Sequence, residues 1–140
     1  MAVRDDVVNT IASFALFADL SEPQLEQVVH TFDEAWFGEG ERILRQGMSG
    51  SGFYVIIEGT AAIRVNGVDR STLHPGDYFG EISALLGDLP VADIVATRPL
   101  RCLVLPAAQL EQFLTAHPRM MYRLLQGEAR KLKHTTAWLS

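Results

Sequence analysis

Residues 79–87, Phe-Gly-Glu-Ile-Ser-Ala-Leu-Leu-Gly, interrupt a long run of strand-like sequence with a segment that lacks strand alternation. The segment predicts a short helix that begins after Gly80 and ends at Gly87, since glycine readily adopts the left-handed conformation found at helix ends. A helical turn inserted among strands is unusual, so this segment is the first place to look for function.

The start of this helix has the chemistry of a ligand site. The first backbone amides of a helix have no partner within it and lie at the positive end of its dipole, where they can hold a phosphate. Glu81 stands at the same opening, and its carboxylate would repel a phosphate but accept a hydrogen bond from a sugar hydroxyl. Together these features predict a nucleotide site. An acidic residue at a helix start is also frequent without any ligand, so these residues alone leave both interpretations open.

Outward from this segment, the chain from residue 32 to residue 106 is typical of short strands. Turns that contain glycine recur every several residues, and β-rich runs such as residues 53–57 and 100–105 lie between them. Asn66-Gly67 is the most specific turn, because a two-residue type I′ hairpin requires positive φ at both central positions. The pattern predicts a sandwich or a barrel.

Helices are predicted on both sides of this strand region. Residues 1–31 carry apolar residues at helical spacing, and Ser21 with Gln24 three positions later forms a capping-box pattern. After Pro106 we expect a short helix that ends at His117-Pro118, and then a long final helix.

The bulk properties narrow the class of protein. A length of 140 residues favours a single domain, residues 1–140, and a net charge of −5 argues against a nucleic-acid binder. No apolar run is long enough to span a membrane, and the N-terminus lacks a signal-peptide pattern, so we expect no membrane contact and a cytoplasmic location. The single cysteine, Cys102, lies in an apolar run and is predicted to be a buried hydrophobe rather than a nucleophile.

The order of these motifs resembles the cyclic-nucleotide-binding domain family of catabolite-activator-type regulators and kinase regulatory subunits. The resemblance covers about residues 14–132. It rests on Phe17–Ser21 as the helical entry, Gly40–Gly47 and Phe53–Gly59 as strand segments, and Pro75–Glu81 as the entry to the family's phosphate-binding cassette.

The resemblance implies a mainly β fold with flanking helices. We expect a double-stranded β-helix, that is, a jelly-roll-like β-roll, with N-terminal helices, a short cassette helix and a long C-terminal helix. The expected parts are a helical entry over 1–31, the β-roll over 32–106 with the cassette at 79–95, and C-terminal helices over 107–140.

The resemblance also implies a ligand site in the cassette. Its members are Gly80, Glu81, Ile82, Ser83, Val91 and Ala92. Glu81 would meet the ribose 2′-hydroxyl, and the amides of Ile82, Ser83 and Ala92 would face the cyclic phosphate. The family has an arginine where this chain has Val91, within Pro90-Val91-Ala92-Asp93.

The missing arginine weakens the expected phosphate contact. Losing a charge-assisted arginine–phosphate bond costs about 1.5–3 kcal/mol, on the order of ten- to a hundred-fold in affinity. Asp93 lies on the same face of an extended strand as Val91, so we expect it to add negative charge near the phosphate. Arg64, Arg98 or Arg101 would have to reach the pocket to compensate.

Two functions therefore remain. In the first, a non-catalytic regulatory domain senses cyclic AMP or cyclic GMP weakly, or another small anionic ligand, and signals through the C-terminal helix. In the second, a ligand-free degenerate domain acts as a dimerisation or protein-interaction module with an unidentified partner. We expect no cofactor, no metal and no catalysis, because His30, His74, His117 and His134 are scattered singly at what we take to be surface or helix-end positions.

The final helix carries an apolar stripe of Met121, Leu125, Leu132 and Leu139, with Glu128 and Thr135 as polar interruptions. The stripe is consistent with a heptad seam that pairs two copies of the chain. Packing of the same stripe on the chain's own barrel explains it equally well. No DNA-reading helix-turn-helix follows, so we expect no direct DNA binding by this chain.

Overall fold

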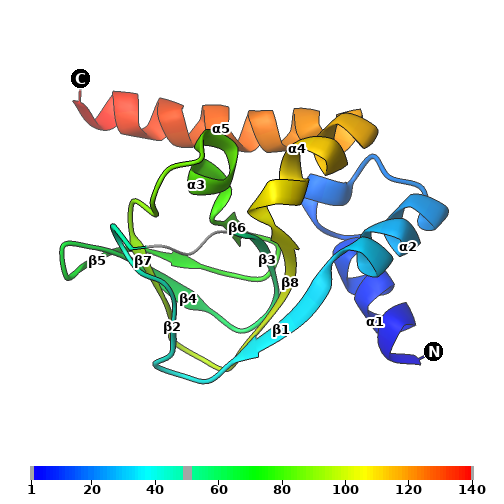
Figure 1. Cartoon of the computed structure of the whole chain (residues 1–140), viewed down its shortest axis with the longest axis horizontal. Coiled ribbons are helices and arrows are strands. Elements are labelled where there is room, and N and C mark those ends of the chain that lie inside the picture. Colours follow the sequence, from blue (N-terminus) through cyan, green and yellow to red (C-terminus); the bar gives the residue numbers. More distant parts are fainter. Residues whose placement is uncertain (1, 49–51, 140) are drawn as a thin grey trace.

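The computed structural model describes residues 2–48 and 52–139, and it shows a β-roll with helices along two of its sides (Figure 1). Two four-stranded antiparallel sheets form the roll, in the orders β1-β8-β3-β6 and β2-β7-β4-β5. The strands are β1 (Asp33–Phe37), β2 (Arg42–Leu44), β3 (Gly52–Glu58), β4 (Ala61–Val65), β5 (Val68–Leu73), β6 (Tyr78–Phe79), β7 (Asp93–Ala96) and β8 (Leu100–Pro106). The predicted β-roll is confirmed.

Three short helical elements precede the roll: α1 (Ala2–Ile11), the 3₁₀ turn η1 (Ala15–Phe17) and α2 (Glu22–Thr31). The start of α2 has the predicted capping box, in which Ser21 Oγ accepts from the Gln24 amide and the Gln24 side chain accepts from the Ser21 amide. These elements contribute to a core under β3 and β8, where Phe32 packs edge-on against Phe53 and Phe113.

A second core fills the inside of the roll. Cys102 is fully buried there, together with residues such as Ile56 and Leu100. The prediction that this cysteine is a buried hydrophobe is therefore confirmed, and burial raises the pKa of its thiol to about 12.

The hairpin turn and the helix ends that were predicted from the sequence are also confirmed. Asn66 and Gly67 both have positive φ between β4 and β5, as a type I′ hairpin requires. The short helix α3 (Glu81–Leu86) begins after Gly80 and ends at Gly87, and both of these glycines are in the left-handed conformation.

Two helices complete the chain: α4 (Ala107–Ala116) and the 22-residue α5 (Pro118–Leu139). Figure 1 shows α5 running along the top of the molecule, with α3 beneath it. The cassette helix and the final helix are thus neighbours, although they are far apart in the sequence.

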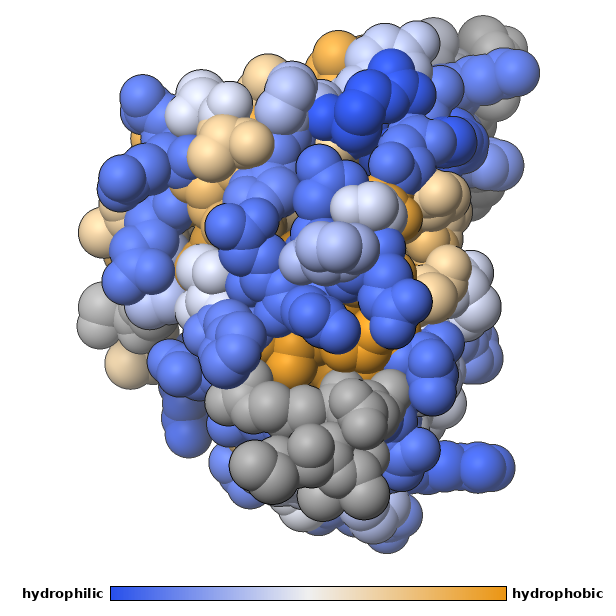
Figure 2. Space-filling view, turned by 90° about the vertical axis from the view of Figure 1, so that its right-hand side faces the viewer, coloured by the Kyte–Doolittle hydropathy of each residue, from blue (hydrophilic) through white to orange (hydrophobic). Residues whose placement is uncertain are grey.

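The exposed apolar side chains are not spread evenly over the surface. The face that carries α1 and α2 is mostly hydrophilic, with a small apolar area (Figure 2). Groups of exposed apolar residues lie on α3 and the loop after it, at Leu85, Leu86 and Leu89, and on α5, at Leu125 and Leu132, while others, such as Trp36 on β1, are exposed singly. None of the helices, over the part of the chain that the structure describes, is long and apolar enough to cross a membrane.

Candidate functional site

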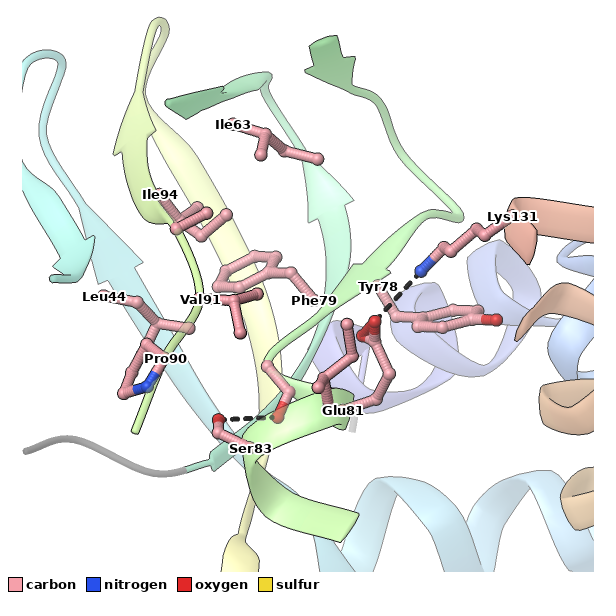
Figure 3. A pocket seen from close by; sticks show the side chains of 13 residues that line it. Leu44, Ile63, Tyr78, Phe79, Glu81, Ser83, Pro90, Val91, Ile94 and Lys131 are labelled. Atoms are coloured by element: carbon pink, nitrogen blue, oxygen red, sulfur yellow. Dashed lines mark hydrogen bonds and ion pairs between the residues drawn. The ribbon is translucent and has the colours of Figure 1, made fainter. Parts of the chain in front are cut away.

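A cavity of about 170 Å³ opens between the cassette, the inside of the roll and α5. Figure 3 shows apolar side chains on its inner wall and the Glu81–Lys131 contact on the side of α5. The cavity is lined by Leu44, Ile63, Tyr78, Phe79, Gly80, Glu81, Ile82, Ser83, Pro90, Val91, Ala92, Ile94 and Lys131. The structure thus brings all six site residues predicted from the sequence to one place.

Gly80 allows α3 to start where it does. Its φ is +84°, and a Cβ at this position would overlap the carbonyl oxygen of Gly52 on β3. Only glycine can make this turn so close to another backbone. The turn places Glu81, Ile82 and Ser83 in the first turn of α3, and Ser83 Oγ donates to the Gly80 carbonyl at 3.3 Å.

Glu81 is the buried charge of the site. Only 4 % of this residue is exposed. Its Oε1 accepts a hydrogen bond from Lys131 Nζ at 3.0 Å, whereas its Oε2 is buried with no hydrogen-bond partner among the described residues. A carboxylate oxygen that is enclosed by protein without a hydrogen-bond partner is costly, so Glu81 is an unusual residue at this position.

Lys131 reaches the cavity from α5 and also contacts two other groups. Its Nζ lies 3.3 Å from Glu128 Oε1 and 4.5 Å from the centre of the Tyr78 ring. Burial, and then the neighbouring Glu81 charge, raise the pKa of Glu128. Burial also raises the pKa of the Tyr78 hydroxyl, and the charges of Glu128 and Glu81 add to the effect.

The role of Lys131 was not predicted from the sequence. In the sequence it is one of several basic residues near the C-terminus, and its partner Glu81 lies 50 positions earlier. Only the docking of α5 over α3 brings the two together.

No arginine stands among the cavity-lining residues. Val91 lines the cavity with 57 % of its surface exposed, and Ala92 is buried. Arg64 pairs instead with Asp69 at 2.6 Å, and Arg101 with Glu34 and Glu58 at 2.9 and 3.1 Å. Neither supplies the charge that the family's arginine would bring.

The expectation for Asp93 was wrong. Its Oδ1 accepts from the Gln46 amide at 2.6 Å, and its Oδ2 lies 3.8 Å from Arg42 Nε. Asp93 does not line the cavity, because these contacts hold its carboxylate toward β2. The strand alternation that the sequence prediction assumed is not established at residues 91 and 92, since β7 begins only at Asp93.

One histidine lies at a helix end, as predicted, and is nearly buried. His117 was placed at a surface or helix-end position; it does follow α4, but only 9 % of it is exposed. Its ring stacks on Phe113, and its Nδ1 lies 3.0 Å from the Phe113 carbonyl oxygen. Among the described residues, no group of three or more His, Cys, Asp or Glu side chains could hold a metal ion.

The apolar stripe of α5 does not pack on the chain's own barrel. Met121, Leu125 and Leu132 are 41, 63 and 67 % exposed, so that alternative is wrong for these three residues, and the side chain of Leu139 lies outside the described residues. The inward contacts are made by neighbours such as Met120 and Leu124. The polar interruption Glu128 lies 3.3 Å from Lys131 Nζ, and residues 129–136 are all exposed.

Comparison with known proteins finds a family model, relatives and solved structures that match this chain. The family model described as "Cyclic nucleotide-binding domain" matches residues 34–117. A cGMP-dependent protein kinase of Caenorhabditis briggsae is 32 % identical over 106 residues, which is 71 % of this chain and 14 % of the kinase.

Solved structures of the same fold include the catabolite activator protein of Thermus thermophilus, with a TM-score of 0.81 and 25 % identity over 89 % of this chain and 61 % of that one. The regulatory domain of Toxoplasma gondii protein kinase A, solved with cAMP, has a TM-score of 0.76 and 22 % identity over 91 % of this chain and 50 % of that one. The chain thus spans about one seventh of the kinase and half to three fifths of these structures.

Proposed function

The chain belongs to the cyclic nucleotide-binding domain family, and from this membership we propose that it is a non-catalytic regulatory domain with a working but altered ligand pocket. It senses a cyclic nucleotide weakly, or a different small ligand, and signals through α5. The observation that carries the proposal is Glu81, a buried carboxylate among the cavity-lining residues, whose Oε2 has no hydrogen-bond partner among the described residues. A pocket with no ligand has no need of a buried carboxylate that only half fulfils its hydrogen bonds.

The pocket and α5 are connected by a direct contact. Lys131 of α5 donates to Glu81 Oε1, so a ligand that donates to the same carboxylate weakens its attraction for Lys131. The ligand thereby changes the free energy of docking of α5, which is the physical requirement for a switch.

The altered part of the pocket is the phosphate side. Val91 supplies no charge, so the backbone amides of Ile82, Ser83 and Ala92 are left to hold a phosphate without a guanidinium. The cyclic nucleotide affinity is therefore lower than an arginine at position 91 would give, by on the order of ten- to a hundred-fold.

Calorimetric titration with cyclic AMP and then cyclic GMP tests this proposal, on the native chain and on Val91→Arg. We expect weak binding by the native chain and binding tightened about tenfold or more in Val91→Arg. Absence of binding by both proteins would contradict the proposal that the pocket is a ligand site.

A second candidate function is a dimerisation or interaction module without ligand. The exposed apolar side chains of α5, Leu125 and Leu132 above all, favour it, because these two lie seven residues apart, as in a heptad seam. Sedimentation of the native chain and of Leu125→Glu tests it. A dimer that the substitution dissociates supports the module, and a monomer at all concentrations rules out self-association through this face.

The other expectations about partners and location remain predictions from the sequence. They are an unidentified protein partner, no direct DNA binding by this chain and a cytoplasmic location.

A further inference from the structure

We infer that Glu81 and Glu128 form a proton-binding site between α3 and α5, and that mild acid tightens the docking of α5 through this site. The effect goes beyond the proposed function, because it requires no ligand in the cavity. It follows from the charges that meet where Lys131 reaches the cassette helix, and from the burial of those charges (Figure 3).

Two carboxylates share one ammonium at this contact. Lys131 Nζ lies 3.0 Å from Glu81 Oε1 and 3.3 Å from Glu128 Oε1, so the two carboxyl groups are close neighbours, and they are in hydrogen-bond contact with each other. Among the described residues, Lys131 is the only cation paired with either of them, since Arg123 of the same helix is held by Asp19 at 2.9 Å. The cluster therefore carries one excess negative charge when both carboxyl groups are ionised.

Burial makes this excess charge costly. The side chain of Glu81 is 5 % exposed and that of Glu128 is 27 % exposed. Tyr78, which packs against the cluster from β6, contributes a ring and a neutral hydroxyl, and the charges of Arg130 and Asp77 near that hydroxyl are opposite in sign. Like charges that meet away from water repel strongly, so the cluster favours a neutral form of one carboxyl group.

Glu128 is the group that takes up the proton. Its contact with Lys131 is the longer of the two, and burial, followed by the charge of Glu81, raises its pKa above the ordinary value of 4.5. A protonated carboxyl group is a hydrogen-bond donor, whereas two carboxylates have no proton to share. Uptake of a proton by Glu128 therefore replaces a repulsion with a hydrogen bond to Glu81, and this bond joins α5 to α3.

The sign of the pH effect follows from the raised pKa. A group whose pKa is higher in the folded state binds its proton more tightly there, so the docked helix gains stability as the pH falls through that pKa toward 4.5. The Asp19 contact, at the first half of α5, does not change in this range, because the pKa of that carboxyl lies below its ordinary value of 3.8. The second half of α5 is thus the part that should respond between pH 8 and pH 5.

Hydrogen exchange measured by mass spectrometry, without any ligand, tests this inference at pH 8 and at pH 5. Glu128→Gln imitates the protonated residue, because its amide is uncharged and donates a hydrogen bond. At pH 8, peptides from the second half of α5 should exchange about two- to tenfold more slowly in Glu128→Gln than in the native chain, as expected for one gained hydrogen bond. At pH 5 the two proteins should exchange at similar rates, because the native Glu128 has then taken up its proton.

The comparisons are made between proteins at one pH, since the intrinsic exchange rate itself changes with pH. His134 also lies in the second half of α5, and histidine changes its charge in this range, but it is present in every protein compared, so its effect cancels. Glu111→Gln is the matched control, because Glu111 is an exposed glutamate of α4 that does not line the cavity. It should exchange like the native chain in α5 at both pH values.

Carbon-13 NMR of the side-chain carboxyl groups follows the proton directly. The signal of Glu128, identified by its loss in Glu128→Gln, should titrate with a midpoint above 4.5. A midpoint at or below 4.5 would overturn the inference, and so would a Glu128→Gln variant that exchanges at pH 8 as fast as the native chain, or one whose slower exchange persists unchanged at pH 5. None of these results bears on the proposed function, because no ligand is present. Failure of the cyclic nucleotide titrations, in turn, leaves the proton site standing.

Discussion

Gly127 shows how one residue fixes the position of a helix. It lies within α5, and a Cβ at this position would overlap the Tyr78 hydroxyl, which packs against the helix backbone. Glycine inside a helix costs about 1 kcal/mol relative to alanine, so its presence here has a steric reason. The absent side chain lets α5 approach β6 closely enough for Lys131 to reach Glu81.

Gly127→Ala should therefore destabilise the protein, although helix propensity alone predicts the opposite sign. We expect a loss of about 1–3 kcal/mol in the free energy of unfolding, as for an overpacked contact. Urea unfolding measures it. Adding Tyr78→Phe to Gly127→Ala removes the overlapping hydroxyl and should recover part of the loss, and a Gly127→Ala variant more stable than the native chain would contradict the steric account.

Cys102 gives a second prediction from a single residue. Burial raises the pKa of its thiol to about 12, and only the thiolate reacts with thiol reagents. The folded protein at pH 8 should therefore react with a disulfide reagent such as Ellman's reagent far more slowly than the urea-unfolded chain does. Equal rates in the folded and unfolded states would show that this position is accessible.

At the scale of single residues, the sequence predicted which residues line the cavity better than it predicted the direction in which a side chain points. The positions of Glu81 and Val91 followed from motifs in a fixed order along the chain, and the structure places both at the cavity. The direction of Asp93 did not follow, because its contacts with Gln46 and Arg42 depend on the pairing of β2 with β7. The contribution of Lys131 depends on the docking of two elements, which no local pattern contains.

At the scale of elements, the helices and turns that obey local rules were predicted well. Ser21 and the two glycines around α3 determine helix ends through bonds and dihedral angles within a few residues. The exposed face of α5 was not predicted, because the heptad spacing of its apolar residues fits more than one register. Contacts with other elements, such as that of Asp19 with α5, select the register.

Asp19 joins the segment after η1 to α5 through two arginines. Its carboxylate accepts hydrogen bonds from Arg123 at 2.9 Å and from Arg119 at 2.8 Å. These bonds, with that of Arg123 the stronger influence, hold the pKa of the Asp19 carboxyl well below its ordinary value of 3.8. A lowered pKa means that the charged form stabilises the folded state above the unfolded-state pKa, and that this contribution is lost as the pH falls further.

Asp19→Asn should therefore lower the free energy of unfolding near neutral pH. The difference from the native chain should stay constant down to about pH 5 and shrink below it, as the native carboxyl in the unfolded state becomes protonated. Urea unfolding across this range measures the difference. Asp88→Asn removes the same charge at an exposed aspartate and should show a smaller difference, and a gap between native and Asp19→Asn that widens in acid would contradict the assigned sign.

At the scale of the whole molecule, α5 is the element that connects the pocket to the N-terminal helices. Along its length it contacts Asp19 through Arg119 and Arg123, Tyr78 at Gly127, and Glu81 through Lys131. Tyr78, Glu81 and Lys131 line the cavity, whereas Asp19, Arg119 and Arg123 do not. We therefore expect the proposed ligand to act on the second half of α5, while the Asp19 contact keeps the first half in place.

Lys131→Ala imitates that effect without a ligand. It should increase amide hydrogen exchange in the second half of α5 and leave the turn around Arg119 close to native, because only the contact with Glu81 and its neighbours is lost. Lys133→Ala is the matched control, since Lys133 is an exposed lysine of the same helix that does not line the cavity. Mass spectrometry of exchanged peptides measures both variants. Faster exchange in Lys131→Ala alone supports control of α5 by the pocket, whereas equal exchange in the two variants would show that the helix is held independently of Glu81.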